Sequence, residues 1–353
     1  MEFTTDKNGV LLIDTSSLIF SIIFRLRGKY LQFKENLAQE EKDLKINEES
    51  FILKNFSKNF CESVNVLVKN YQTKELIFAR DDNRERIWRV KRFPKYKSNR
   101  KKFTRHKKEN IELGPVFSAI YQTQYDNLIK SLGAISIKVA EAEADDVIAV
   151  LTKFFSDQNQ RVVIVADDFD YYQLMVYPEV EVYDNRGNSF FEKSGQIPPI
   201  VFSQLKILRG DKSDNIPSCQ ILIDERKCRV VDDMGIIGRK ILSFIEAKML
   251  LKMNVLQRKS VSIKMAKELQ QNPQKILDLL EKDPLFLETF RRNSELIDMK
   301  NIPHNIVFKI LRSYSMEIFK YTQSMYMKVD MKLDVNLAMS ININQQVIIA
   351  ITD

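Results

Sequence analysis

The chain has 353 residues, of which 44% are hydrophobic and 29% charged, a composition typical of a soluble globular protein rather than a disordered chain. Basic residues outnumber acidic ones by 55 to 47, giving a net charge of +8, so we expect an acidic partner such as nucleic acid. No apolar run approaches the roughly 18 residues of a membrane helix, and the first residues lack the pattern of a signal peptide. Cys61, Cys219 and Cys228 show no zinc-site or disulfide spacing. We therefore expect a cytoplasmic protein without a membrane partner.

The first 200 residues alternate between strand and helix patterns. Short apolar runs predict strands at residues 10–14, 75–79, 134–139 and 161–166. Apolar residues at helical spacing predict helices at residues 16–27, 51–71, 116–132 and 144–155. Residues 28–50 are polar and charge-mixed, and we expect an inserted loop or a surface helix there. The alternation predicts an α/β fold with a mainly parallel central sheet flanked by helices.

Beyond residue 200 the pattern is mostly helical. The predicted helices cover residues 201–209, 235–251, 262–271, 274–281, 284–297 and 303–314. We expect an α/β core over residues 1–200, a helical part over 201–330 and a C-terminal tail over 331–353. The tail contains the apolar run 347–351 and is a candidate docking segment.

Carboxylates follow three of the predicted strands. They are Asp14, Asp81 and Asp168, with Asp170 two residues further on. Ligands of open α/β sheets bind at the carboxyl ends of the strands, so we expect these side chains on one rim. Neighbouring carboxylates raise each other's pKa values unless a cation lies between them, which favours a hard divalent metal. Asp82 and Asp167 are direct neighbours of Asp81 and Asp168, so the register of each pair is open. Asp81 is favoured by its distance from Trp88, and Asp168 by the pattern Asp-x-Asp-x-x-Gln-Leu.

A second acidic group, Glu143, Asp145 and Asp146, begins the predicted helix 144–155. Taken alone, acidic residues in a first helical turn cap the helix and interact favourably with its dipole. Together with the strand-end aspartates they favour two-metal phosphoryl transfer, in which cations held by carboxylates activate water and stabilise the leaving oxygen. Asp211 and Asp214 form a weaker signal, either a polar turn or further metal ligands. The sequence contains no nucleophile elbow or P-loop that would compete with this chemistry.

Residues 84–108 contain 13 Lys and Arg and one Glu, a local charge of +12. Trp88, Phe93, Tyr96 and Phe103 are interleaved with these cations. Bases stack on aromatic rings while Lys and Arg contact phosphates, so the stretch favours nucleic-acid binding over a merely solvated helix face or arm. Such binding should depend strongly on salt.

These motifs, in this order, resemble the 5′-nuclease superfamily of flap endonucleases and 5′→3′ exonucleases, and within it the RNase H of T-even bacteriophages. The residues that carry the resemblance are 12–14, 78–81, 88–89, 96–100, 142–153, 168–174, 210–215, 295–298 and 302–306. The resemblance implies a PIN-like α/β nuclease core with a basic helical arch at about residues 84–110. It also implies a mostly helical C-terminal part that contains a helix–hairpin–helix.

The resemblance implies two Mg²⁺ ions, or Mn²⁺ in their place. The inner metal ligands that it implies are Asp14, Asp81, Glu143, Asp145, Asp168 and Asp170, and the outer ones are Asp146, Asp211 and Asp214. Lys97 and Arg89 are the implied catalytic cations that steer the scissile phosphate. Asp145 and Asp168 are implied to be catalytic as well as metal-binding.

The resemblance also implies two nucleic-acid-binding regions. The arch is implied to contact the 5′ single strand through Arg86, Trp88, Arg92, Tyr96, Lys97, Arg100 and Lys101. Residues 233–240 resemble the helix–hairpin–helix that binds duplex phosphates, through Gly235, Gly238, Arg239 and Lys240. In relatives a K⁺ ion sometimes takes part in that contact.

The implied activity is cleavage near the 5′ end of RNA–DNA hybrids or branched DNA, including ribonuclease H activity that removes RNA primers during phage DNA replication. An inactive structure-specific DNA-binding protein on the same fold is an alternative, although binding alone does not require nine carboxylates. A compact PIN-type ribonuclease is another, disfavoured by the arch and the helical C-terminal third. We expect a monomer that contacts nucleic acid, and a single-stranded-DNA-binding protein or sliding clamp through its C-terminal region.

Overall fold

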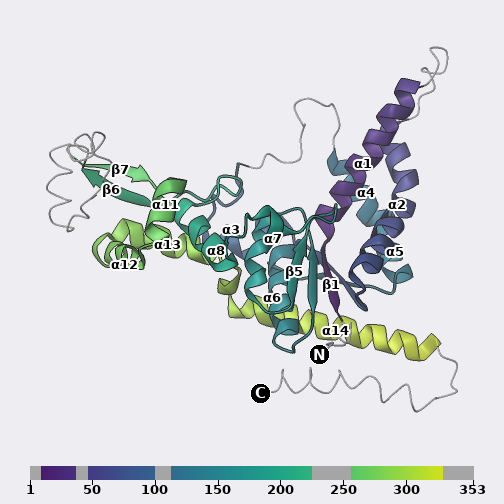
Figure 1. The fold of residues 1–353 in the computed structure, drawn as a ribbon. Helices are drawn as coiled ribbons and strands as arrows, with labels where there is room; N and C mark the ends of the chain where they lie inside the picture. The colour runs from purple at the N-terminus through teal and green to yellow at the C-terminus, as the bar shows by residue number, and fades with distance from the viewer. Residues whose placement is uncertain (1–8, 37–46, 100–112, 225–255, 329–353) are drawn as a thin grey trace, which may run out of the picture. The chain divides into compact units, whose positions relative to one another are not determined.

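The computed structural model describes residues 9–36, 47–99, 113–224 and 256–328 (Figure 1). The elements up to residue 165 are β1 (Val10–Asp14), α1 (Thr15–Asn36), α2 (Glu48–Tyr71), β2 (Glu75–Arg80), the 3₁₀ helix η2 (Arg84–Arg86), α3 (Trp88–Arg92), α4 (Leu113–Ile120), the π-helical turn η3 (Tyr121–Tyr125), α5 (Asp126–Ser131), β3 (Ile135–Lys138), α6 (Ala144–Ser156) and β4 (Val162–Val165). The later elements are the 3₁₀ helix η4 (Phe169–Val176), β5 (Val180–Tyr183), α7 (Phe190–Lys193), α8 (Pro199–Arg209), β6 (Gln220–Asp224), β7 (Leu256–Ser260), α11 (Ile263–Gln270), α12 (Pro273–Lys282), α13 (Pro284–Ile297), the 3₁₀ helix η5 (Met299–Asn301) and α14 (His304–Lys328).

The central sheet has the strand order β3-β2-β1-β4-β5. Strand β1 pairs in parallel with β2 and β4, and β2 pairs in parallel with β3. The predicted α/β fold with a mainly parallel central sheet is therefore confirmed. Strand β5 and η4 are not predicted from the sequence; β5 has only four residues, too few to give a clear apolar period.

The chain forms two compact units that interleave along the sequence. Unit 1 consists of residues 1–82, 118–165 and 304–353, and unit 2 consists of residues 83–117 and 166–303. The sequence instead predicts a division at residue 200, and that division stays a prediction. The predicted helix 235–251 and the tail 331–353 lie outside the described residues.

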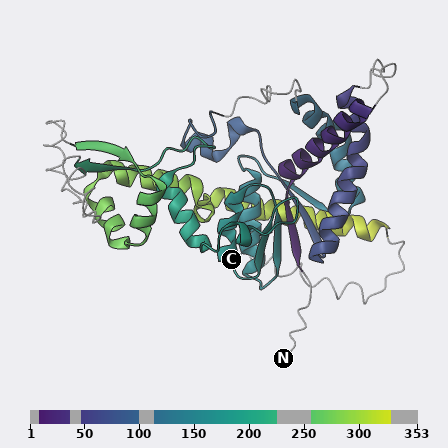
Figure 2. The ribbon, with the colours of Figure 1, turned by 45° about the horizontal axis from the view of Figure 1, so that its top comes forward.

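In unit 1, every residue of β1 is buried, as expected for a parallel strand that is covered on both faces. Helices α1 and α2 lie side by side as an antiparallel hairpin (Figures 1 and 2). Helix α1 continues to Asn36, so the predicted insertion begins as a helix rather than a loop. Helix α2 begins where the Asn47 side chain accepts a hydrogen bond from the Glu49 amide, because that acceptor satisfies one of the open amides of the first turn.

The predicted helix 116–132 is interrupted by η3. A π-helical turn inserts one residue into the helical register, and such turns are frequent at functional sites. Here it brings the rings of Tyr121 and Tyr125 to 4.4 and 4.8 Å from the Arg80 guanidinium carbon. Arg80 directly precedes Asp81, so this stack fixes the end of β2.

Helix α14 packs against β3 and α6 and extends well beyond the predicted end at residue 314. Tyr314 is central to this packing because its ring lies edge-on to the rings of Phe154 and Phe155, with centroids 5.8 and 5.5 Å away. Its hydroxyl donates a hydrogen bond to Glu75 Oε1 at 2.7 Å. Among the helices within the described ranges, none is both long and apolar enough to cross a membrane.

Glu75→Gln is expected to stabilise unit 1 at neutral pH by about 1 kcal/mol, the lower end of the cost of burying a polar group that its partners compensate only in part. Burial raises the pKa of Glu75, although the Tyr314 hydrogen bond opposes the rise. The folded protein therefore holds a proton that the unfolded chain releases, and wild-type stability falls as the pH rises from the unfolded to the folded pKa. Gln lacks this loss and still accepts from Tyr314.

Urea unfolding from pH 4 to pH 8 tests this expectation. The stability advantage of Glu75→Gln should grow with pH and level off above the folded pKa of Glu75. Tyr314→Phe in the wild-type background should make stability fall more steeply with rising pH, because the buried Glu75 carboxylate then has one hydrogen-bond donor fewer. An advantage that is the same at every pH contradicts the assigned cause.

In unit 2, two apolar clusters hold the helices together. One cluster joins α8, α11, α12 and α13 and includes Leu208, Cys219, Ala266 and Phe286. The other joins the segment before residue 100 to α8 and α13, through residues that include Ile87, Tyr96, Ile207, Ile216 and Leu296. The second cluster fixes the position of the arch base, residues 84–99.

The prediction of a mostly helical C-terminal part is confirmed, and this part also contains a ribbon that the sequence does not predict. The helices α8, α11, α12 and α13 match the predicted ones closely, but β6 and β7 form an antiparallel ribbon that pairs Gln220 with Ser260 and Asp224 with Leu256. The pairing partners are more than 30 residues apart, so no local hairpin signal connects them in the sequence.

Candidate functional site

Asp14 and Asp81 lie at the same edge of the sheet. In the parallel register of β1 and β2, Asp14 is opposite Ala79, and Asp81 follows two residues later. Asp14 Oδ1 accepts a hydrogen bond from the Ser17 amide at 3.0 Å. The two oxygens of Asp81 accept from Ser16 Oγ and from the Ala144 amide, each at 2.9 Å. Asp81 thus joins the starts of α1 and α6 at this edge.

In the acidic group at the start of α6, Asp146 caps the helix. Asp146 is fully buried, and its Oδ2 accepts a hydrogen bond from the Glu143 amide at 2.9 Å. This is the helix-capping contact that acidic first turns commonly make. Glu143 is only 4% exposed, and Asp145 is partly exposed.

The carboxylates of unit 1 interact with one another. The Asp81 side chain reaches the surface, yet protein atoms surround its carboxylate. This burial raises the pKa of Asp81, and the charges of Asp145 and Glu143 raise it further, while the Ala144 and Ser16 hydrogen bonds oppose them. Such a group of carboxylates favours a bound cation, because a cation removes the mutual repulsion.

In the two ambiguous aspartate pairs, Asp82 and Asp167 have partners of their own. Asp82 accepts from the Glu141 amide at 2.9 Å and pairs with Lys138 at 3.7 Å. Asp167 accepts from the Asn185 amide at 3.1 Å and from its Nδ2 at 2.8 Å. Asp81 and Asp168 accept hydrogen bonds as well, so the choice of Asp81 and Asp168 as metal ligands stays a prediction.

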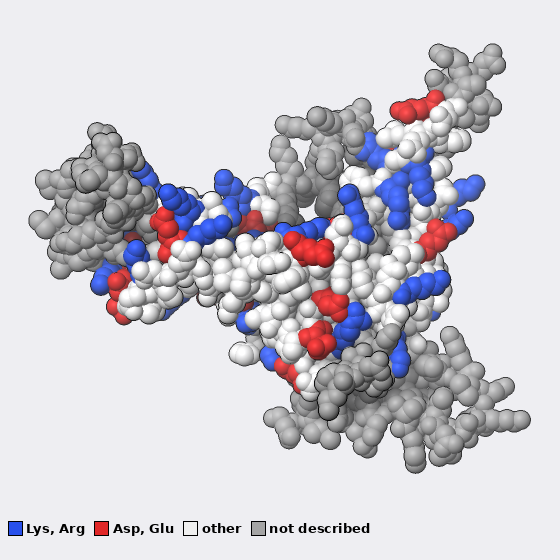
Figure 3. Space-filling view, viewed as in Figure 1, with Lys and Arg blue, Asp and Glu red and all other residues white. Residues whose placement is uncertain are grey.

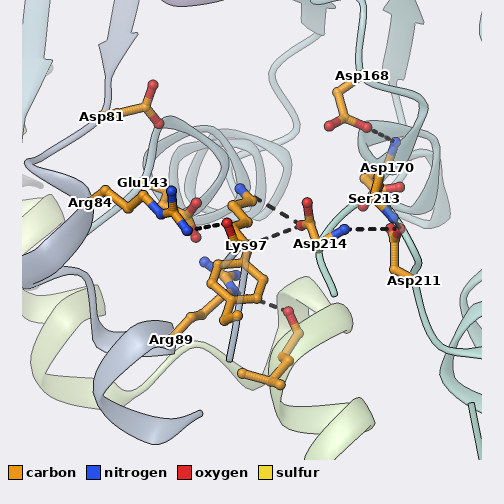
Figure 4. A network of polar contacts seen from close by, with 12 residues as sticks. Asp81, Arg84, Arg89, Lys97, Glu143, Asp168, Asp170, Asp211, Ser213 and Asp214 are labelled. Carbon is orange, nitrogen blue, oxygen red and sulfur yellow. Dashed lines mark hydrogen bonds and ion pairs between the residues drawn. The ribbon is translucent and has the colours of Figure 1, made fainter. Parts of the chain in front are cut away.

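In unit 2, a lysine lies between two of the predicted ligands. Asp168 Oδ1 accepts from the Asp170 amide at 2.9 Å and begins η4 (Figure 4). Lys206 of α8 pairs with Asp170 and, at 2.7 Å, with Asp211. One ammonium group therefore occupies the position of a shared cation between the two carboxylates.

The pKa values follow from these contacts. Burial raises the pKa of Asp170 to about 7, with Asp168 and Asp211 adding to the rise and Lys206 opposing it. Burial also acts on Asp211, but Lys206 and Ser213 outweigh it and lower the pKa of Asp211 to about 2. Burial disfavours the charge of Lys206, yet both carboxylates outweigh it and raise the pKa of Lys206. Lys206 therefore stays charged.

The loop after α8 is tightly folded around Asp211. The Asp211 and Ile216 backbones exchange hydrogen bonds of 2.8 and 2.7 Å, and Asp211 Oδ1 accepts from the Ser213 amide at 2.8 Å. Gly210 precedes the loop with φ of 66° and ψ of −173°, a conformation open essentially to glycine alone. The loop thereby presents Asp214, which is 9% exposed.

The arch base is bound to this loop. The Lys97 amide donates to the Asp214 carbonyl at 2.7 Å, and Lys97 Nζ lies 3.7 Å from Asp214 Oδ2. The Tyr96 hydroxyl donates to the same oxygen at 3.1 Å. Lys97 has a left-handed φ of 52°, and Arg84 donates to its carbonyl oxygen. The structure therefore brings two predicted arch residues, Tyr96 and Lys97, to one predicted metal ligand.

The other predicted cations of the arch differ in accessibility. Arg89 is only 3% exposed; its Nε donates to the Leu296 carbonyl at 3.0 Å, and its guanidinium lies 4.5 Å from the Trp88 ring centroid. These contacts favour a packing role for Arg89 and Trp88 between α3 and α13, and the catalytic role of Arg89 stays a prediction that its burial does not favour. Arg86 is exposed, and Arg92 pairs with Glu295 at 2.6 Å.

Six predicted nucleic-acid-binding residues lie outside the described residues. They are Arg100, Lys101, Gly235, Gly238, Arg239 and Lys240.

Sequence reasoning missed Lys206 and a basic surface on the α1–α2 hairpin. Exposed Lys and Arg side chains on this hairpin include Arg25, Lys29, Lys54 and Lys58 (Figure 3). Counting Lys and Arg at helical spacing along residues 15–36 and 48–71 could have identified the basic surface of the hairpin. No sequence signal identifies Lys206, because its partners are contributed by other elements.

The donor set fits a hard divalent cation. Every candidate ligand is a carboxylate, and Mg²⁺ and Mn²⁺ prefer oxygen. Within the described ranges, no group of three or more His, Cys, Asp or Glu side chains is arranged to hold a metal ion. The observations that support the fit are the contact of Asp81 with the start of α6, next to Glu143 and Asp145, and the ammonium shared by Asp170 and Asp211.

Comparisons with known proteins agree with this geometry. The chain is 31% identical over 159 residues to a 5′-3′ exonuclease of Buchnera aphidicola subsp. Schizaphis graminum, covering 43% of this chain and 50% of the relative. It is 35% identical over 100 residues to ribonuclease H of Enterobacteria phage T4, covering 28% of this chain and 32% of the relative. The chain thus spans half or less of the length of these two relatives.

The fold is similar to that of the T5 D15 protein co-crystallized with metal ions, with a TM-score of 0.53 and 16% identity, covering 90% of this chain and 98% of that chain. The family described as "5'-3' exonuclease, N-terminal resolvase-like domain" matches residues 9–197, which is more than half of the chain. With the parallel sheet and the strand-end aspartates, this match shows that the chain belongs to the family of the 5'-3' exonuclease N-terminal resolvase-like domain.

Proposed function

We propose that the protein is a metal-dependent 5′-nuclease, a 5′→3′ exonuclease and flap endonuclease that hydrolyses phosphodiester bonds near the 5′ end of RNA–DNA hybrids or branched DNA. The observation that carries this proposal is the contact of Lys97 and Tyr96 with Asp214. Lys97 of the arch lies beside Asp214, a candidate metal ligand. A phosphate group of the substrate would bind there, between the lysine and the metal. Removal of RNA primers during phage DNA replication is the biological role that fits this substrate.

The proposed metal ligands are the nine carboxylates of the acidic groups. They are Asp14, Asp81, Glu143, Asp145, Asp146, Asp168, Asp170, Asp211 and Asp214. Two bound Mg²⁺ or Mn²⁺ ions would supply an activated water and stabilise charge on the phosphate and leaving oxygens. The metal ions named for the T5 D15 protein support this proposal.

The chain's own residues have distinct proposed roles. Lys97 binds a phosphate oxygen and stabilises the charge that develops there, and Tyr96 orients Asp214 through its hydroxyl. Lys206 keeps Asp170 and Asp211 together by sharing one positive charge. The exposed cations Arg86 and Arg92 of the arch contact the phosphate backbone.

Three end-labelled substrates with Mg²⁺ test the function: a 5′ flap, a nicked RNA–DNA hybrid and a blunt duplex. A ladder of short 5′ products indicates exonuclease action, and a single product cut at the junction indicates flap cleavage. Raising the salt should weaken binding steeply, because many Lys and Arg contacts release counterions. Binding of the flap without cleavage in either Mg²⁺ or Mn²⁺ contradicts the proposal and favours the inactive DNA-binding alternative.

Further parts of the proposal concern residues that the structure does not describe. A K⁺ ion at residues 233–240 and docking of residues 331–353 onto a single-stranded-DNA-binding protein or sliding clamp stay predictions. The monomeric state and the cytoplasmic location likewise stay predictions.

A further inference from the structure

The loop between β3 and α6 delivers Glu143 and Asp145 to the edge of the sheet, and it contains a strained residue. Glu141 has a left-handed φ of 72°, which a non-glycine residue adopts only at a cost in free energy. Such a conformation persists where the surrounding contacts fix it, and it is found mostly at functional sites. The contacts that fix Glu141 therefore indicate what the loop must hold in place.

Asp82 holds the backbone of this loop. The Glu141 amide donates to Asp82 Oδ2 at 2.9 Å, and the Asp82 amide donates to the Ala142 carbonyl at 2.9 Å. The Asp82 side chain is only 5% exposed and pairs with Lys138 at 3.7 Å. A buried carboxylate that accepts from a backbone amide fixes that amide, because losing the contact would leave a buried charge without compensation.

Lys309 holds the side chain of Glu141. It lies in the first turns of α14 and forms an ion pair with the Glu141 carboxylate. Glu141 is thus fixed at its amide by Asp82 and at its carboxylate by α14. The Lys309 side chain is 41% exposed, and an ion pair with that exposure contributes little to stability.

Asp82 and Glu141 are both close in the sequence to candidate metal ligands. Asp82 follows Asp81, and Glu141 lies two residues before Glu143. Asp81 Oδ1 also accepts from the Ala144 amide at 2.9 Å, so a shift of the loop changes the distances from Asp81 to Glu143 and Asp145. Mutation of groups that orient metal ligands commonly lowers metal affinity or activity, by about 10- to 100-fold.

We infer that Asp82, Glu141 and Lys309 form a positioning clamp that sets the spacing of Asp81, Glu143 and Asp145, so that α14 controls metal affinity from outside the ligand set. This inference rests on the proposed metal-dependent function. Asp82, Glu141 and Lys309 are positioning residues, and none of them is proposed to touch metal or nucleic acid.

Lys309→Met tests the clamp, with Mn²⁺ binding to the full chain measured by calorimetry and by electron paramagnetic resonance. We expect Mn²⁺ affinity to fall about 10-fold, the lower end of the effect of outer-shell partners, with an unchanged thermal midpoint. Cleavage should recover at saturating Mn²⁺, and KM for the flap substrate should stay the same. Lys309→Arg should restore the affinity, because arginine keeps the cation.

Lys320→Met is the matched control. It removes one cation from the same helix, where Lys320 pairs with Glu317 on that helix at 2.6 Å, so wild-type Mn²⁺ affinity is expected. Glu141→Gly keeps the left-handed backbone and removes the partner of Lys309. The effects of Glu141→Gly and Lys309→Met on Mn²⁺ affinity should not add in the double variant, because each variant removes the same ion pair.

Equal Mn²⁺ affinity in Lys309→Met and Lys320→Met would overturn the clamp, as would additive effects in the double variant. A lower thermal midpoint without a change in Mn²⁺ affinity would reduce the clamp to a structural contact. Failure of the proposed function is distinguishable, because the wild-type chain itself would then neither bind Mn²⁺ nor cut the flap.

Discussion

Asp168→Asn is expected to lower the rate of cleavage about a thousand-fold, because metal-ion catalysis is worth several kcal/mol and each ~1.4 kcal/mol is a factor of ten. Asparagine keeps the oxygen that accepts from the Asp170 amide at 2.9 Å and begins η4. The side chain is exposed, so the fold should not change. Flap binding without divalent ions should be no weaker than in the wild type, because the variant removes a negative charge.

Asp167→Asn is a matched control for this variant. It removes the same charge one residue earlier, at a carboxylate that is also exposed and that accepts two hydrogen bonds from Asn185. We expect nearly full cleavage, with at most a small loss of stability. Single-turnover cleavage and flap binding of both variants decide the register. If Asp167→Asn is inactive and Asp168→Asn is active, the assignment of the pair is reversed.

Gly210→Ala is expected to destabilise unit 2 by about 3 kcal/mol, the upper range for a residue forced into a glycine-only backbone conformation. An added Cβ would lie 2.4 Å from the Ile216 carbonyl oxygen and 2.5 Å from the Pro217 carbonyl carbon. Both are backbone atoms, so the loop must open to remove the overlap. Opening breaks the hydrogen bonds between Asp211 and Ile216 and moves Asp214 away from Lys97.

Urea unfolding and cleavage assays together test the Gly210 prediction. Cleavage should fall in proportion to metal affinity, because the loop carries two candidate ligands. Gly28→Ala is the control, since an added Cβ there meets nothing within 4 Å in the middle of α1. It should raise stability by roughly 0.5–1 kcal/mol, the helix preference of alanine over glycine. Wild-type stability of Gly210→Ala would contradict the geometry of the loop.

Two cations of the arch base, Arg89 and Lys97, have similar sequence contexts but different burial and different partners in the structure. Arg89 and Lys97 occupy recognisable motif positions in the same basic stretch. Arg89 is buried and donates to the Leu296 carbonyl, whereas Lys97 lies beside a carboxylate of the candidate metal site. Variants of Arg89 should therefore act mainly through stability, and variants of Lys97 mainly through cleavage.

The sequence by itself determined the elements that depend on local pattern. Strand β1 is a continuous apolar run, and α6 repeats apolar residues at three- and four-residue steps, so both were predicted within a residue or two. Parallel strands end at one edge, and this rule placed Asp14 and Asp81 together before any contact was known. These features follow from the periodicity of side chains along one segment, which a single sequence contains.

The tertiary structure alone decided which side chains meet. Lys206 lies between Asp170 and Asp211, Lys309 pairs with Glu141, and β6 pairs with β7 across more than 30 residues. The partners of Asp82 and Asp167 likewise appear only in the structure. Except for the pair of Lys206 with Asp211, these contacts join separate segments of the chain. Their meeting depends on how helices and strands pack rather than on the pattern within either segment.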